Sequence, residues 1–159
     1  MIKYFENLRE EDAQIMYKVP VYVTILLAGA DDKIDKKELQ EAISIANLKK
    51  IKARKLLVDY FAEVVDTFEE DLYKEIDVMP DSAEERNPIL VEKLERVNII
   101  FHYLDSSFAI QFYESMKDWA NKIATASGGV LGFLSVGHEE SKYVDLRMIR
   151  NPVRLKKKK

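Results

Sequence analysis

One stretch decides how the chain is organised: Ala28-Gly29-Ala30-Asp31-Asp32-Lys33-Ile34-Asp35-Lys36-Lys37-Glu38-Leu39. It ends the apolar run that begins at Val19, turns, and starts a new helix. Asp35 and Glu38 have the spacing of a capping box, in which an N-cap side chain and a carboxylate three residues later bond the free backbone N–H groups of the first turn. Gly29 is a typical helix terminator. The stretch therefore predicts two helices joined by an acidic turn.

Apolar periodicity on both sides of this turn predicts further helices. Residues 9–18 and 20–29 are expected to form two helices, because Pro20 breaks a continuing helix but suits the first turn of the next. The helix over 20–29 is apolar nearly all round, so it should lie at the centre of the core. Further helices are expected at about 35–46, 52–77, 87–104, 105–127 and 138–150. Without a convincing strand, the prediction is an all-α, compact single-domain bundle of about seven helices.

The composition bounds the class of protein. The chain has 159 residues, of which 47% are hydrophobic and 33% charged, as in an ordinary folded domain. It has no cysteine, which excludes disulfides and Cys-ligated zinc and favours a cytoplasmic location. The N-terminus does not resemble a signal peptide, and the longest apolar run, residues 19–30, is too short to span a bilayer. We expect a helical domain over residues 1–150 and a disordered basic tail over 151–159.

Charge is strongly segregated along the chain. A basic cluster occupies residues 49–55, and eleven acidic residues between Asp59 and Glu85 stand against the single base Lys74. The acidic run is interpreted as the solvated face of a long helix, and its alternative is a surface for a basic partner. No broad basic face indicates specific nucleic-acid binding. The lysine-rich end, residues 154–159, favours at most weak contact with anionic surfaces.

Two segments resemble the TerB-like (tellurite-resistance protein B-like) family. Residues 25–38, ILLAGADDKIDKKE, match its apolar helix followed by Ala-Asp-Gly-x-Ile/Val-x-x-x-Glu, and residues 123–133, IATASGGVLGF, resemble the C-terminal segment of small bacterial members. The two segments bracket nearly the whole chain. Asp32 stands where the family usually has glycine, and aspartate tolerates a left-handed backbone better than most residues.

The resemblance implies a compact helical bundle without enzymatic activity. The family is associated with tellurite-resistance and stress-response operons, and its domains look like interaction modules, some of them self-associating. We therefore predict a non-enzymatic interaction module with an unidentified protein partner, and a homo-oligomer is one form that this could take. The resemblance also implies, as an alternative, an acidic surface that binds divalent cations.

That alternative centres on four acidic residues: Asp31, Asp32, Asp35 and Glu38. They offer hard oxygen ligands close together, as Ca²⁺ or Mg²⁺ requires, so a weakly bound divalent cation is the one cofactor considered. The competing interpretation is structural: Asp35 and Glu38 cap the helix, Ile34 packs into the core, and the paired aspartates make the turn. A hydrolase that used these acids with a metal and water is a third hypothesis. Of the two histidines, His102 is expected to be partly buried and structural.

Overall fold

The computed structural model describes residues 1–30, 33–34, 36–126 and 143–153. Within these ranges the chain is all-α, without a strand. The five α-helices are α1 (Glu10–Ala28), α2 (Lys36–Lys52), α3 (Val58–Val78), α4 (Ala83–Ile100) and α5 (Ser106–Ala126). Short 3₁₀ turns precede α1, α3 and α5: η1 (Lys3–Phe5), η2 (Lys55–Leu57) and η3 (Phe101–Tyr103). The predicted all-α bundle is confirmed, but the described residues form five long α-helices and not the seven expected.

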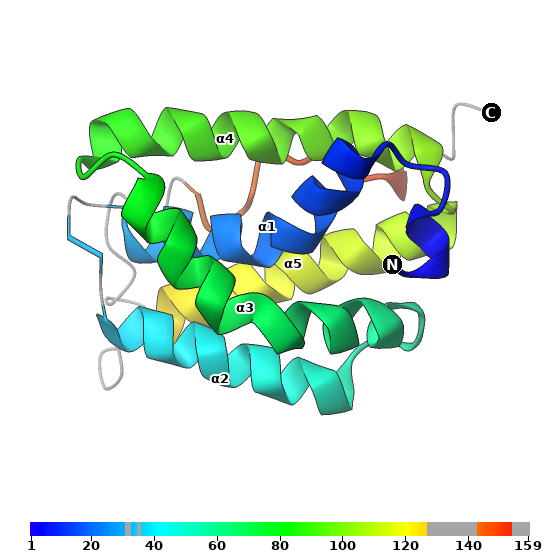
Figure 1. Ribbon diagram of the computed structural model, residues 1–159, viewed down its shortest axis with the longest axis horizontal. Coiled ribbons are helices and arrows are strands. Elements are labelled where there is room, and N and C mark those ends of the chain that lie inside the picture. The colour runs from blue at the N-terminus through cyan, green and yellow to red at the C-terminus, as the bar shows by residue number, and fades with distance from the viewer. Residues whose placement is uncertain (31–32, 35, 127–142, 154–159) are drawn as a thin grey trace.

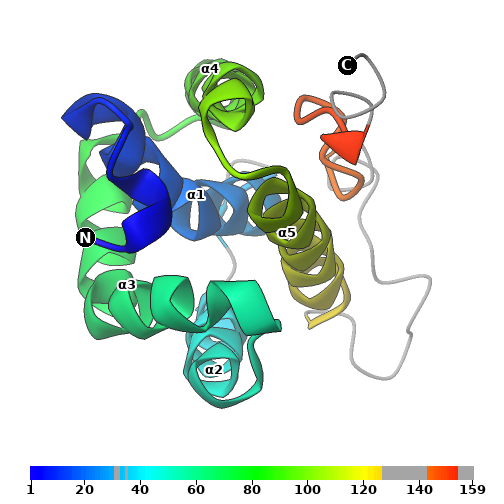
Figure 2. The same ribbon diagram turned by 90° about the vertical axis from the view of Figure 1, so that its right-hand side faces the viewer.

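Helix α1 is the centre of the bundle. It packs against each of the other four helices and lies between α4 and α2, with α3 and α5 on its two remaining flanks (Figures 1 and 2). Every residue from Val19 to Ala28 is buried. The prediction that the apolar run lies at the core is therefore confirmed. No helix in the described ranges is long and apolar enough to cross a membrane.

The predicted break at Pro20 is wrong, because α1 runs through it. Proline has no N–H, so the carbonyl of Met16 loses its usual partner four residues later. The hydroxyl of Tyr60, on α3, donates to that carbonyl at 2.5 Å. A buried side chain thus replaces the missing backbone donor, and the helix continues at little cost.

A second set of buried hydrogen bonds lies one turn further along the same helix. The hydroxyl of Thr24 donates to the carbonyl of Pro20 at 2.7 Å, and the indole N–H of Trp119 on α5 donates to the Thr24 oxygen at 3.0 Å. All three residues are buried. Their polar atoms are therefore paired inside the core, as burial requires, and the pairing fixes α5 against α1.

Two other helix boundaries differ from expectation. Helix α2 passes Asn47 and ends at Lys52, after which the extended backbone of Arg54 leads the chain into η2. Helix α4 starts at Ala83, before the predicted Asn87-Pro88 signal, because the Ser82 side chain accepts from the Glu85 N–H at 3.2 Å as its N-cap. By contrast, the predicted cap of α5 is confirmed, since the Asp105 carboxylate accepts from the Phe108 N–H at 2.9 Å.

The predicted helix over 138–150 is wrong for its described part. Residues 143–150 form two successive turns, closed by the bonds Leu146 N–H to Tyr143 O and Ile149 N–H to Leu146 O, each 2.9 Å. Leu146 has φ 48°, which no helical residue adopts. The glycine-rich segment 128–137 and the lysine-rich end 154–159 lie outside the described residues.

Candidate functional site

The acidic turn is described only at its edges. Asp31, Asp32 and Asp35 lie outside the described residues, so their predicted roles as cap or metal ligands stay predictions. Glu38 is described: it sits in the first turn of α2 and is only 1% exposed. Among the residues that the structure describes, no three His, Cys, Asp or Glu side chains gather as a metal site.

Gly29 ends α1 as predicted, for a reason that the sequence did not indicate. Its N–H donates to Ile25 O at 2.9 Å and its φ is −110°, a value open to any residue. What requires glycine is a close approach. A Cβ placed there would lie 2.6 Å from Nη2 of Arg86 and 3.1 Å from Cγ1 of Ile34. Glycine therefore makes room for an arginine.

Arg86 is the functional-looking residue that sequence reasoning missed. It lies in the first turn of α4 and is 1% exposed. Its Nη2 donates to Gly29 O at 2.6 Å, and its Nη1 donates to Asp81 O at 2.9 Å and Pro80 O at 3.3 Å. One guanidinium thus ties the end of α1 to the loop between α3 and α4. Sequence analysis did not indicate Arg86, because it lies in the polar run 81–87, which was predicted to be a loop.

The position of Arg86 changes how the acidic turn should be interpreted. Its guanidinium lies against Gly29, directly before the turn, so a fixed positive charge already stands at the turn's first residue. A cation at the C-terminal end of a helix is stabilised by the helix dipole. Burying a guanidinium is costly unless negative charge compensates it. The described edge of the turn, at Gly29, therefore already lies beside a buried positive charge.

A pocket of 360 Å³ opens at the other end of α1. It lies where the start of α1 meets the end of α4 and η3. Polar side chains form part of its wall and exposed apolar ones stand beside them, the full lining being Asn7, Leu8, Arg9, Asp12, Arg96, Ile99 and Tyr103. Ile99 is 47% exposed and Tyr103 is 66% exposed. These are among the largest apolar surfaces that the described part of the chain offers to solvent.

A two-pronged ion pair holds the wall of this pocket. Arg96 Nε and Nη2 donate to the two carboxylate oxygens of Asp12, at 3.0 and 3.1 Å. Asp12 is buried and Arg96 is partly exposed. The hydrogen bond with Asp12 raises the pKa of the Arg96 guanidinium. Arg9 reaches the same carboxylate only at 3.9 Å and is largely exposed, so its charge is available to a ligand.

The predicted basic cluster over 49–55 is partly used inside the chain. Arg54 bridges to α5, with Nη1 3.1 Å from the Glu114 carboxylate and Nη2 2.7 Å from that of Asp118. Lys49 is buried with its ammonium 5.8 Å from the centre of the Phe61 ring. Burial, followed by the nearby Lys122 charge, lowers the pKa of Lys49. Lys49 thus packs the end of α2 against α3, and Arg54, just after α2, ties the connection to α5.

Two other predicted features can be placed. Six acidic side chains of α3 are exposed: Asp59, Glu63, Asp66, Glu69, Glu70 and Asp77. This agrees with a solvated acidic face for these six. Asp71 is half-buried, and the Glu75 side chain, only 15% exposed, turns inward to pair with Lys18 of α1 at 3.1 Å, so the expectation is wrong for Glu75. His102 is exposed on η3, so its predicted partial burial is wrong, because the chain leaves the α-helix at Ile100.

Comparisons of this chain with protein-family models, with curated proteins and with solved structures found no match. The resemblance to the TerB-like family therefore stays a prediction from the two segments quoted above.

Proposed function

We propose that this chain is a non-enzymatic helical interaction module of the TerB-like kind, linked to stress or tellurite resistance. Its binding surface would be the pocket at the start of α1 together with the exposed Ile99 and Tyr103. The observation that carries this proposal is the exposure of these two side chains beside a preformed pocket. Tyrosine and arginine are the residue types that dominate binding energy in protein interfaces.

The surface favours a partner segment that is apolar and acidic. Ile99 and Tyr103 offer apolar contact area, and Arg9 offers an exposed guanidinium for a carboxylate. The ion pair of Asp12 with Arg96 holds the pocket wall before any partner arrives, which lowers the entropy lost on binding.

The proposal is tested by comparing two double variants, each of which replaces two exposed apolar side chains by alanine. Ile99→Ala/Tyr103→Ala removes the proposed surface, whereas Tyr73→Ala/Val78→Ala removes exposed apolar side chains at the end of α3. A partner captured by the wild type should be kept by the second variant and lost by the first, and titration of the purified partner should show a loss of at least tenfold for the first. Equal binding by both variants would refute the assignment of this surface.

The second candidate is a divalent-cation module at the acidic turn. The observation in its favour is Glu38, an almost fully buried carboxylate within this stretch. The Arg86 guanidinium beside Gly29 weighs against it, because a fixed positive charge repels a divalent ion. Calorimetric titration with Ca²⁺, Mg²⁺ and Mn²⁺ decides: absence of binding at millimolar metal, or binding unchanged by Asp31→Ala/Asp32→Ala, removes this candidate.

A further inference from the structure

Lys49 carries a buried amine without a close counter-charge. It lies near the end of α2 and is 8% exposed. Its ammonium stands 5.8 Å from the centre of the Phe61 ring, at the outer limit of a cation–π contact. In the part of the chain that the structure describes, no carboxylate forms an ion pair with it and no group accepts a hydrogen bond from it. Burial without such a partner disfavours the ammonium and favours the uncharged amine.

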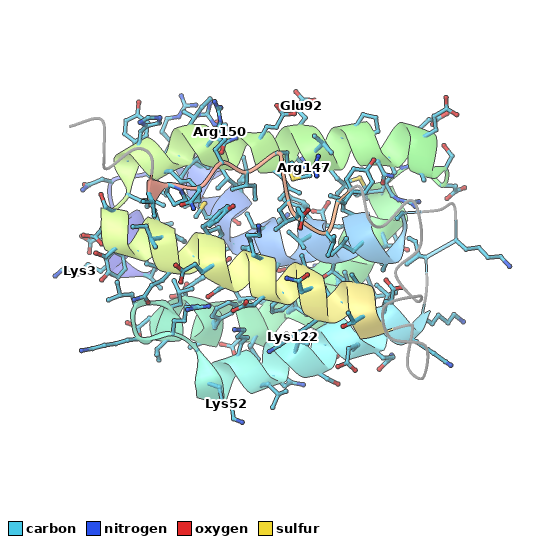
Figure 3. All side chains as sticks on the ribbon, turned by 180° about the vertical axis from the view of Figure 1, so that it is seen from behind. Lys3, Lys52, Glu92, Lys122, Arg147 and Arg150 are labelled. Atoms are coloured by element: carbon cyan, nitrogen blue, oxygen red, sulfur yellow. The ribbon has the colours of Figure 1, made fainter. Side chains whose placement is uncertain are left out.

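A row of charged side chains on α5 lies beside this amine. Glu114, Asp118 and Lys122 follow one another at intervals of four residues, so they share one side of the helix. Arg54, just after α2, pairs with the first two at 3.1 and 2.7 Å. Figure 3, in which Lys122 is labelled, shows it on the side of α5 that faces α2. The two acids are thus engaged by Arg54, whereas Lys122 adds a positive charge near Lys49.

Arg54 has one donor to spare at this place. Its Nη1 and Nη2 reach the two acids of α5, but its buried Nε–H has no acceptor among the described residues. A buried donor without an acceptor is rare in folded proteins and calls for an explanation. An anion formed between α2 and α5 would supply the acceptor.

The charges around Lys49 act mostly in one direction. Burial has the largest effect on its amine, followed by the positive charge of Lys122, and Arg54 adds to both, whereas Asp118 opposes them. The pKa of Lys49 therefore lies below 10.5. An ordinary exposed lysine is uncharged in only about one molecule in a thousand at neutral pH, so the lower pKa increases the amount of amine that is free to react.

The uncharged amine of Lys49 suits a reaction with carbon dioxide. The nitrogen lone pair attacks the carbon atom and forms an N–C bond, one C=O π pair moves onto oxygen, and the nitrogen releases a proton to water. The product is a carbamate anion. The reaction consumes a neutral amine and creates a negative charge, and both changes are favoured where burial disfavours the ammonium and two cations stand nearby. Carbon dioxide is also small and uncharged, which matters for an amine that is 8% exposed.

We propose that Lys49 is a site of reversible carbamate formation with carbon dioxide, and that Lys122 and Arg54 hold the anionic product between α2 and α5. The modification replaces mutual repulsion of three cations by attraction between an anion and two cations. It gives the Arg54 Nε–H an acceptor. The site lies on other elements than the pocket at the start of α1, so either proposal can fail without the other.

The first test uses the full chain and isotopically labelled bicarbonate at neutral pH. Nuclear magnetic resonance should show a carbamate signal, and alkylation of the carbamate before proteolysis should place it on Lys49 by mass spectrometry. The digest separates this site from a free chain terminus, whose amine also reacts because its pKa is about 7.7–8.0. Lys74 is the matched control: it is exposed, pairs with Glu70 and should stay unmodified. Absence of the signal, or its location on another lysine, would overturn the proposal.

The second test changes charges on α5 without altering the core. Lys122 is exposed and Asp118 is about half-exposed, so the variants should fold. Lys122→Glu should lower the carbamate fraction at least tenfold at a given bicarbonate concentration, because the product then meets repulsion, whereas Lys122→Arg should preserve the fraction. Asp118→Asn should raise it at least twofold, because the acid that favours the ammonium is lost. A fraction that Lys122→Glu leaves unchanged would contradict the assigned role of the cations.

Thermal unfolding gives a readout that does not depend on trapping. A modification made in the folded state raises the melting temperature in proportion to the logarithm of the bicarbonate concentration, once the site is filled. Sodium chloride at equal ionic strength and pH controls for screening. The wild type should show the rise, and Lys122→Glu and Lys49→Arg should not, because a guanidinium stays protonated. An equal rise in all three proteins, or none beyond that with sodium chloride, would refute the site.

Discussion

Replacing Gly29 by alanine tests whether Arg86 is the reason for a glycine at the end of α1. The backbone of Gly29, with φ −110° and ψ 25°, does not itself exclude alanine. The new Cβ would lie 2.6 Å from Arg86 Nη2, a distance that no stable contact keeps. Because Nη1 of the same guanidinium is tied to Asp81 and Pro80, it can retreat only by giving up its hydrogen bond to Gly29.

The magnitude follows from that bond. A hydrogen bond from a charged group contributes about 1.5–3 kcal/mol. Alanine restricts the unfolded chain and returns about 0.4–1 kcal/mol. Crowding of the new Cβ against Ile25 O at 3.0 Å and Ile34 at 3.1 Å adds about 1 kcal/mol, so we expect Gly29→Ala to lower the free energy of unfolding by about 2 kcal/mol. For a domain of this size the melting temperature should fall by roughly 4–8 °C.

A double-mutant cycle separates this cause from general crowding. Arg86→Met keeps an apolar side chain and removes the guanidinium, so the cost of Gly29→Ala should fall to about 1 kcal/mol in that background, the remainder coming from Ile25 O at 3.0 Å and Ile34 at 3.1 Å. Urea unfolding followed by circular dichroism gives the four free energies. If the two substitutions are additive within about 0.5 kcal/mol, the guanidinium is not what excludes a side chain at position 29.

Two further predictions concern other buried polar groups. Tyr60→Phe should cost about 1–3 kcal/mol, because it leaves the Met16 carbonyl without its donor. The loss should shrink in a Pro20→Ala background, where residue 20 regains an N–H for that carbonyl, and an unchanged loss by urea unfolding would contradict this account. Lys49→Met should change the pH dependence of stability. Burial lowers the pKa of Lys49 below 10.5, so the unfolded chain binds more protons and the wild type gains stability relative to the variant as pH rises towards 10.5. A stability difference that is constant between pH 7 and 10.5 would show that Phe61 and the nearby charges leave Lys49 unperturbed.

The sequence predicted the class of fold and the position of its core because both depend on hydrophobic periodicity. The apolar run before Gly29 is buried as expected, and the Asp105 cap is present. These features are local: a run of apolar residues or a capping side chain acts on its own neighbours. Local signals were sufficient wherever a local interaction decides the structure.

The errors arise where a distant residue overrides a local signal. Pro20 looked like a helix break because its missing hydrogen bond is visible in the sequence, whereas the compensating Tyr60 lies forty residues away. In the described part of the helix expected at 138–150, residues 143–150 form turns instead, because Asn98 and the core hold Leu146 and Ile149 there. Periodicity cannot report such partners.

The sequence predicted where the candidate site lies in the chain, but not which distant residues contact it. The glycine and the acids of the turn marked it, yet the residue that lies against it is Arg86, 57 positions beyond Gly29. Its capping role depends on α4 starting at Ala83 and on the approach of the α3–α4 loop. The pocket lined by Leu8, Arg96 and Tyr103 likewise joins residues at the start of the chain to residues at the end of α4 and in η3, and no motif indicated it.

A common requirement explains why side chains donate hydrogen bonds to backbone carbonyls of α1. A helix buried on all sides cannot use water to satisfy an irregular backbone group, so any such group needs a protein donor. The Met16 carbonyl accepts a hydrogen bond from Tyr60 of α3, and the Gly29 carbonyl accepts one from Arg86 of α4. The Pro20 carbonyl accepts one from Thr24 of α1, whose hydroxyl oxygen in turn accepts from Trp119 of α5. Three different helices are thus registered against α1 by directional bonds. Non-directional apolar contact alone would allow these helices to slide or rotate, so the irregular points of α1 are where the arrangement of the bundle is specified.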